Sequence, residues 1–124
     1  MIETYFAQLE KTLQEFRNIR SYTLTKKVYN FKQGFVSGKV VFEDNSRLDF
    51  TEVRDTDVKG KIKYRYQYMN EKNELIFRYD NAPHHREIST YPHHKHVSEE
   101  VEDSSEPVLR EVLFEIAWKS REGQ

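Results

Sequence analysis

Regular alternation of apolar and polar side chains over residues 59–68 is the feature that most limits how this chain can fold. Successive side chains of a β-strand point to opposite faces, so the alternation predicts a strand with one buried face and one exposed face. The apolar face holds Ile62, Tyr64, Tyr66 and Tyr68, and the polar face holds Lys61, Lys63, Arg65 and Gln67. A strand of this kind indicates an antiparallel sheet that is covered on one side.

Four further segments have the alternation or the turn boundaries of strands, and they cover residues 21–28, 35–42, 47–53 and 75–80. Residues 3–19 instead carry apolar side chains at intervals of three and four, which predicts an amphipathic helix. A polar loop over residues 98–106 should lead into a second helix that begins at Pro107. We therefore expect one α+β domain over residues 1–124, with an N-terminal helix, a five- to six-stranded antiparallel sheet and a C-terminal helix. Both helices should pack on one face of the sheet.

The composition favours a small folded domain and excludes several classes of protein. Hydrophobic residues make up only 36% of the chain, but eight Tyr, eight Phe and one Trp can fill a core from few positions. Because there is no cysteine, disulfide scaffolds and thiolate metal sites are excluded. The N-terminus lacks the apolar run of a signal peptide, and no segment is long and apolar enough to cross a bilayer. We expect a cytoplasmic protein with no membrane partner.

The net charge of −1 conceals an uneven distribution of charge along the chain. Residues 59–96 carry eight Lys and Arg against four acids, whereas residues 97–116 carry seven acids against one Arg. A basic middle segment beside an acidic tail favours a face that binds a polyanion, with the acidic segment shielding it or meeting a basic partner. The alternative is a mixed solvated surface.

All five histidines fall within residues 84–96, next to several arginines and a lysine. Histidine changes its charge near neutral pH, so two histidines can act as the base and the acid of metal-free RNA cleavage. Such a reaction also needs a cation for the phosphate, and arginine offers a bidentate fork. This first interpretation needs no cofactor. The catalytic candidates are His84, His85, His93, His94, His96 and Arg78.

Basic side chains at alternate strand positions lie about 7 Å apart, close to the phosphate spacing of single-stranded nucleic acid. An aromatic side chain near them can stack an unpaired base. The candidates for binding RNA are Lys61, Lys63, Arg65, Arg86, Tyr91 and Lys95. The alternative for the strand is a solubilising exposed face.

Three other interpretations of the histidine segment stay open. His94 and His96 flank one residue and would face the same way on a strand. Together with His84 or His85 and with Asp80 or Glu87, they form a candidate site for a divalent metal such as zinc, manganese or iron. Neighbouring Lys95 and Arg86 would raise the cost of binding such a cation. The histidines can also serve to hydrogen-bond a loop to the sheet. Finally, the chain can be a binding module without catalysis, which inhibits by occupying an RNA, a ribosome or a protein.

Several blocks resemble the TumE-type toxin family of prokaryotic toxin–antitoxin systems. They are Tyr-Asp-Asn-Ala-Pro-His-His at 79–85 and Pro-His-His-Lys-His at 92–96, with supporting similarity at 65–68, 75–78 and 105–116. The resemblance implies a small cytosolic protein that inhibits growth and is neutralised by direct binding of a helix-turn-helix antitoxin. It leaves the chemistry open. We infer an endoribonuclease from the residue types and from the general habit of small α+β toxins of the RelE and barnase sort, with RNA or the ribosome as target and a homodimer as a possible assembly.

Overall fold

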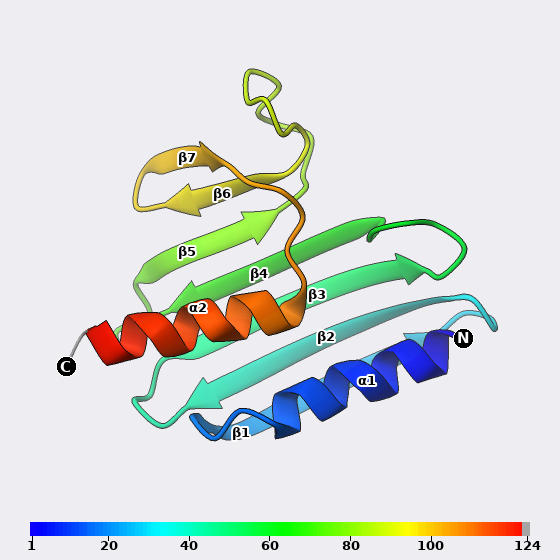
Figure 1. Ribbon diagram of the computed structural model, residues 1–124, viewed down its shortest axis with the longest axis horizontal. Helices are drawn as coiled ribbons and strands as arrows, with labels where there is room; N and C mark the ends of the chain where they lie inside the picture. Colours follow the sequence, from blue (N-terminus) through cyan, green and yellow to red (C-terminus); the bar gives the residue numbers. More distant parts are fainter. Residues whose placement is uncertain (123–124) are drawn as a thin grey trace.

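Seven antiparallel strands form a single sheet in which the spatial order is the order along the chain, β1 to β7. The computed structural model describes residues 1–122 (Figure 1). Its elements are α1 (Ile2–Gln14), β1 (Ile19–Val28), β2 (Gln33–Phe42), β3 (Arg47–Asp55), β4 (Lys63–Met69), β5 (Leu75–Asp80), β6 (His94–Val97), β7 (Glu100–Asp103) and α2 (Leu109–Glu122). Because each strand pairs with the next one, the connections are hairpins, as the short turns in the sequence predict.

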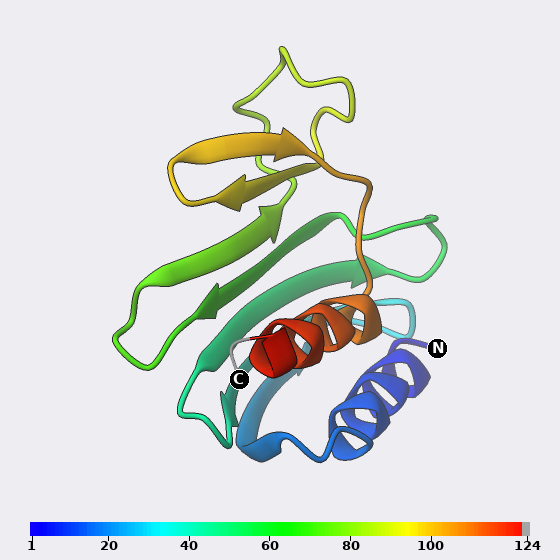
Figure 2. The same ribbon diagram turned by 60° about the vertical axis from the view of Figure 1, so that its left-hand side comes forward.

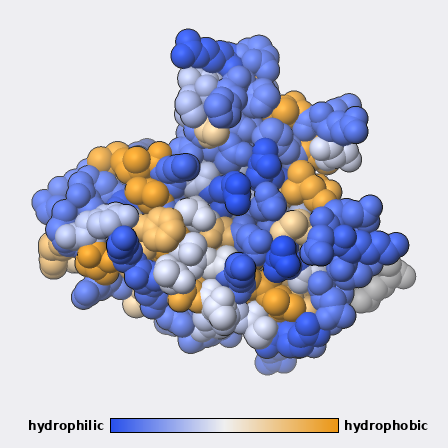
Figure 3. Space-filling model, turned by 180° about the vertical axis from the view of Figure 1, so that it is seen from behind, coloured by the Kyte–Doolittle hydropathy of each residue, from blue (hydrophilic) through white to orange (hydrophobic). Residues whose placement is uncertain are grey.

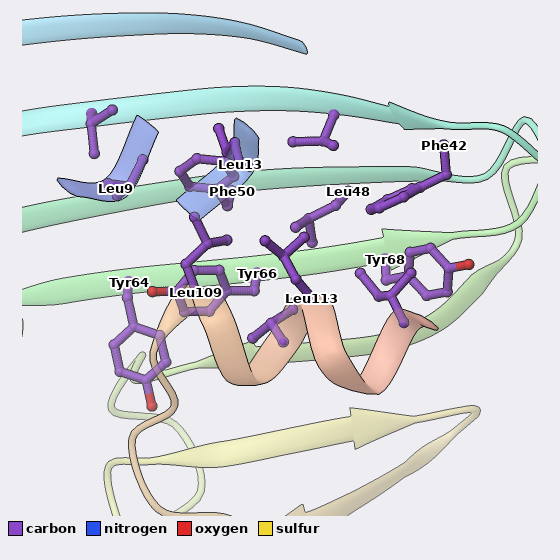
Figure 4. Close-up of a cluster of buried hydrophobic side chains, with 14 of the residues drawn as sticks. Leu9, Leu13, Phe42, Leu48, Phe50, Tyr64, Tyr66, Tyr68, Leu109 and Leu113 are labelled. Carbon is purple, nitrogen blue, oxygen red and sulfur yellow. The ribbon is translucent and has the colours of Figure 1, made fainter. Parts of the chain in front are cut away.

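Both helices lie on the same face of the sheet and leave the other face open (Figure 2). The core forms between this face and the helices, and Figure 4 shows Leu9 and Leu13 of α1 and Leu109 and Leu113 of α2 against the inward aromatic side chains of the strands. Strands β6 and β7 and the loop over residues 81–93 extend beyond the helices (Figure 1). The α+β class and the placement of both helices are therefore as expected.

The sheet has seven strands, where the sequence indicates five or six. The additional strand β7 lies within residues 98–106, which we expected to be a loop. Ser98, with a φ of 54°, lies in the turn from β6, and β7 then pairs with β6 along its whole length. Backbone hydrogen bonds form this hairpin, so its polar and acidic side chains give no alternating apolar signal. Charged side chains are typical of an edge strand, where they discourage pairing with other chains.

Three predicted boundaries also shift. The first helix ends at Gln14 rather than near Ile19, and Ile19 instead begins β1. The second helix begins at Leu109, two residues after Pro107. Strand β4 begins only at Lys63, because the chain turns through Gly60, whose φ is +83°, before the ladder with β3 starts. Among the described residues, neither helix has the length and apolar character needed to cross a membrane.

A buried carboxylate connects the first helix to the sheet. Glu52 of β3 is fully buried, and its two carboxylate oxygens accept hydrogen bonds from the hydroxyl of Tyr5 on α1 and from that of Tyr66 on β4, the second at 2.6 Å. A buried charge is tolerated only when hydrogen bonds replace its water. The two tyrosine hydroxyls supply these hydrogen bonds. In turn, the buried Tyr66 hydroxyl has Glu52 as its acceptor.

We expect Glu52→Leu to lower the free energy of unfolding by about 2 kcal/mol, because the buried Tyr66 hydroxyl would lose its acceptor. The double variant Glu52→Leu/Tyr66→Phe should recover part of this loss, since it also removes the buried Tyr66 hydroxyl and leaves only the Tyr5 hydroxyl without its acceptor. Urea denaturation of the two variants and the wild type measures the difference. A double variant no more stable than the single one would contradict the hydrogen-bond account.

Candidate functional site

The register between β5 and β6 brings two of the histidines onto the open face of the sheet. Arg78 pairs with His96 and Asp80 pairs with His94, and directly opposed residues in a ladder share a face. The intervening Tyr79 and Lys95 point the other way, where both contact Glu115 of α2, at 2.5 and 2.7 Å. By this register, Arg78, Asp80, His94 and His96 belong to the side of the sheet away from the helices. Figure 3 shows the molecule from that side.

Asp80 is the centre of this group. Its Oδ1 accepts a hydrogen bond from the backbone N–H of Ala82 at 3.0 Å and lies 2.9 Å from Nε2 of His94. Its Oδ2 accepts from Nε of Arg78 at 3.1 Å and lies 3.7 Å from Nε2 of His96. The carboxylate is buried, and these partners compensate for the loss of water.

His85 joins the group from the loop that connects β5 to β6. Its ring centroid lies 4.9 Å from that of His94 and 5.6 Å from that of His96, and the His94 and His96 centroids are 4.8 Å apart. One ligating atom of each of the three residues lies within 4.8 Å of the others. The sequence does not indicate which three of the five histidines meet, because His84 and His93 directly precede His85 and His94 in the chain.

Exposure divides the three rings into a buried one and two accessible ones. The His94 side chain is only 3% exposed, whereas His96 is 18% and His85 is 31% exposed. Nδ1 of His94 donates to the carbonyl oxygen of Pro92 at 3.0 Å, and its Nε2 faces Asp80, so the ring is fixed at both ends. A ring held in this way supports its neighbours. His96 and His85 are more accessible to a substrate, and Nδ1 of His85 lies 3.4 Å from the exposed carboxylate of Glu87.

The pKa of His96 is lowered from its ordinary value of 6.5, chiefly because the ring is partly buried and also because the Arg78 guanidinium lies beside it. Asp80 opposes the shift without cancelling it. A lowered pKa means that the imidazole is neutral at pH 7. A neutral imidazole can accept a proton, which is what a general base does.

Part of the expected basic strand borders the cluster. Arg65 of β4 pairs with Asp80 of β5, and Lys63 lies two residues earlier on the same face. Both side chains are exposed. They form, with Arg78, a cationic strip next to the histidines.

Lys61 does not belong to this strip, contrary to the sequence pattern. It lies before β4, is buried, and donates to Glu106 at 3.3 Å and to the carbonyl oxygen of Pro107 at 2.8 Å. Its ammonium also lies 5.4 Å from the ring centroid of Tyr64, on the core side. Alternation predicts which face a side chain occupies only within a strand, and β4 begins at Lys63. Before that residue the pattern is reversed: Lys61 is buried and Ile62 is exposed.

The remaining candidates lie outside the cluster. His93 stacks on Tyr64, whose hydroxyl is 2.9 Å from its Nδ1, and this contact attaches the loop to the sheet. His84 is exposed on the loop. Arg86 lies over the ring of exposed Tyr91, 5.9 Å from its centroid, so these two form a small platform on the same loop. Lys95 is paired with Glu115 on the helix side.

The structure defines the contacts of two sets of acidic residues. Asp80 contacts Arg78, His94 and His96, so it connects the members of the cluster. The sequence indicates only that Asp80 and Arg78, two residues apart on a strand, share a face. Glu106 and Glu115 show that the acidic tail does meet the basic middle segment, through ion pairs with Lys61 and Lys95. Both ion pairs lie on the core side of the sheet. Glu106 and Glu115 therefore do not neutralise Lys63 and Arg65, which lie on the other side.

Arg78→Gln should raise the pKa of His96, because a neighbouring positive charge that disfavours the imidazolium is removed. NMR titration of the histidine ring resonances in the presence of a chelator measures the pKa in each protein. Arg86→Gln, which changes an exposed arginine on the loop, serves as the matched control and should leave it unchanged. An unchanged or lower pKa in Arg78→Gln would show that Arg78 does not influence His96.

Comparison with known proteins gives one match. A family model described as "Toxin TumE" matches residues 9–120, a range that contains the whole sheet and every member of the cluster. The family resemblance of the histidine blocks is thereby confirmed. Neither the curated proteins nor the solved structures provide a significant match.

Proposed function

This chain belongs to the TumE toxin family, and we propose that it inhibits growth by cleaving RNA without a metal ion, with His96 and His85 as base and acid. The observation that carries the proposal is the cluster of three histidines around Asp80 on the open face of the sheet, beside Arg78 and Arg65. Two accessible imidazoles with adjacent cations are what cleavage by a 2′-hydroxyl group requires.

In the proposed reaction the 2′-oxygen attacks the adjacent phosphorus while Nε2 or Nδ1 of His96 takes its proton. The bond from phosphorus to the 5′-oxygen breaks, and His85 gives that oxygen a proton. The products are a 2′,3′-cyclic phosphate and a 5′-hydroxyl, so atoms and charge balance without an external reactant. The guanidinium groups of Arg78 and Arg65 stabilise the additional negative charge on the phosphate oxygens in the transition state.

His94 and Asp80 act as positioning residues in this scheme. Asp80 fixes the Arg78 guanidinium at 3.1 Å and lies close to His96, while His94 holds Asp80 from the buried side. The pair therefore sets the distance between the base and the cation. Preorganised groups of this kind stabilise charge without the cost of reorientation during the reaction.

The surroundings suggest how RNA is bound. Lys63 and Arg65 occupy alternate positions of β4 on the same face, so they can contact successive phosphates. The Arg86–Tyr91 platform on the loop can stack an unpaired base. Membership of a toxin family implies a cognate antitoxin. We propose that it is a helix-turn-helix protein that neutralises the toxin by direct binding in the cytoplasm.

We expect His96→Gln and His85→Gln each to reduce RNA cleavage by about 10²- to 10⁴-fold, because each removes one proton-transfer group. The control is His84→Gln, which changes an exposed histidine of the same loop and should cleave like the wild type. Purified proteins are incubated with total RNA in the presence of EDTA, and the ends of the products are analysed. Glutamine preserves size and polarity, and far-UV circular dichroism verifies the fold of each variant.

The outcomes separate the remaining interpretations. Cleavage that persists in EDTA, gives 2′,3′-cyclic phosphate ends and fails in both variants supports the proposal. Cleavage that EDTA abolishes would assign the cluster to a metal-dependent nuclease. Growth inhibition by a protein that binds RNA but leaves it intact would indicate a non-catalytic inhibitor.

The double variant Lys63→Gln/Arg65→Gln should bind RNA less tightly and with a weaker dependence on salt. Each lost phosphate contact on a single strand reduces the slope of log K against log salt concentration by roughly 0.7, so the expected change is about 1.4. Fluorescence anisotropy in the His96→Gln background measures binding without cleavage. Lys11→Gln/Lys119→Gln, which removes the same charge from exposed positions of the helices, should leave the slope unchanged. Equal slopes in both double variants would exclude the β4 strip from the binding surface.

A further inference from the structure

The same three histidines have the arrangement of a metal-binding triad. Their rings meet nearly at right angles, with interplanar angles of 67°, 73° and 76°. Three imidazoles that converge on one point cannot stack, so their planes cross in this way. With one ligating nitrogen of each ring close to those of the other two, this is an arrangement that a metal ion can use.

The spacing is suited to a small transition ion. Zinc–nitrogen bonds of about 2.0 Å in a tetrahedral site place two ligand nitrogens roughly 3.3 Å apart. The ligating atoms of His85, His94 and His96 lie within 4.8 Å of one another, so only a short inward movement is needed. His94 and His96 lie on β6, whereas His85 lies on the loop, where the backbone is not held by the sheet ladder.

The hydrogen bonds around His94 favour coordination through its Nε2. Nδ1 donates to the carbonyl oxygen of Pro92, an outer contact that fixes the tautomer and orientation of a metal-ligating histidine. Nε2 lies 2.9 Å from Asp80 Oδ1, and this carboxylate, which also holds Arg78 at 3.1 Å, is an outer contact of the triad. The set is three imidazoles, a composition that favours zinc over magnesium or calcium.

The charges nearby are less adverse than the sequence suggests. Lys95 lies on the opposite face of the sheet and is neutralised by Glu115 at 2.7 Å. Arg86 lies against Tyr91 on the exposed loop. Arg78 is the cation in contact with the group, and it binds Oδ2 of Asp80, the oxygen that does not face His94.

We propose that His85, His94 and His96 bind one zinc ion and that the bound ion inhibits RNA cleavage. The inhibitory half rests on the proposed function, whereas the binding half stands on the geometry alone. A coordinated nitrogen has no lone pair for a proton. An ion held by His85 and His96 therefore removes both the acid and the base at once. The toxin would be active only while free zinc is scarce.

Cobalt(II) reports binding directly, because a tetrahedral site with nitrogen ligands gives it strong visible absorption. We expect the chelator-treated full chain to take up one equivalent of cobalt, and added zinc to displace it. His85→Gln and His96→Gln should each weaken zinc binding at least tenfold, measured by competition with a chromogenic chelator. His84→Gln is the matched control and should bind zinc like the wild type. His85 is partly exposed on a loop, so its variant keeps the fold, and circular dichroism verifies this.

Activity is measured on the same samples. One equivalent of zinc should reduce RNA cleavage at least tenfold, and excess EDTA should restore it. Absence of stoichiometric cobalt or zinc binding would overturn the proposal, and so would equal loss of binding in His84→Gln and His85→Gln. Cleavage that increases with zinc would overturn the inhibitory half. A chain that binds zinc at this site and never cleaves RNA would support the binding half, while the inhibitory half would fall together with the proposed function.

Discussion

The hydrogen-bonded ladder that joins β4, β5 and β6 is the constraint on which the candidate site depends. Because side chains alternate across a strand, the register alone decides that Arg65, Arg78, Asp80, His94 and His96 share one face. A slip of one residue between β5 and β6 would send the two histidines towards α2 and bring Lys95 to the open face. The pairs of Tyr79 and Lys95 with Glu115 oppose such a slip, since they fix the other face against the helix.

The two faces of the sheet therefore have different functions. The covered face supplies stability through inward aromatic side chains, two helices and the buried carboxylate of Glu52. The open face carries charge and the histidine cluster, at the end of the sheet that extends beyond the helices (Figure 2). This separation lets the chemical groups vary in protonation without disturbing the apolar core. It also helps to explain why a chain with so few hydrophobic residues folds, because the aromatic side chains of its core, such as Phe50, Tyr66 and Phe77, are gathered on the covered side.

The histidines of the cluster can transfer protons and can also coordinate a metal ion. One hydrogen bond orients His94 for both functions. The hydrogen bond from His94 to the Pro92 carbonyl oxygen orients the ring, whether its Nε2 carries a proton towards Asp80 or coordinates an ion. A proton and a metal ion compete for the same lone pairs. In our proposals, the RNA-cleaving state and the zinc-bound state are therefore mutually exclusive, and the availability of the metal would set which one predominates.

The sequence by itself determined the α+β class, the positions of both helices and the concentration of reactive groups in one segment, since periodicity and composition are local properties. It also indicated the toxin family through the histidine blocks. Only the tertiary structure decided that His85, His94 and His96 converge, whereas His93 packs on Tyr64 and His84 stays on the loop. It likewise moved Lys61 into the core and paired β7 with β6. These features depend on strand register, on where a strand begins and on a loop that folds back, and each is fixed by contacts between residues distant in the chain.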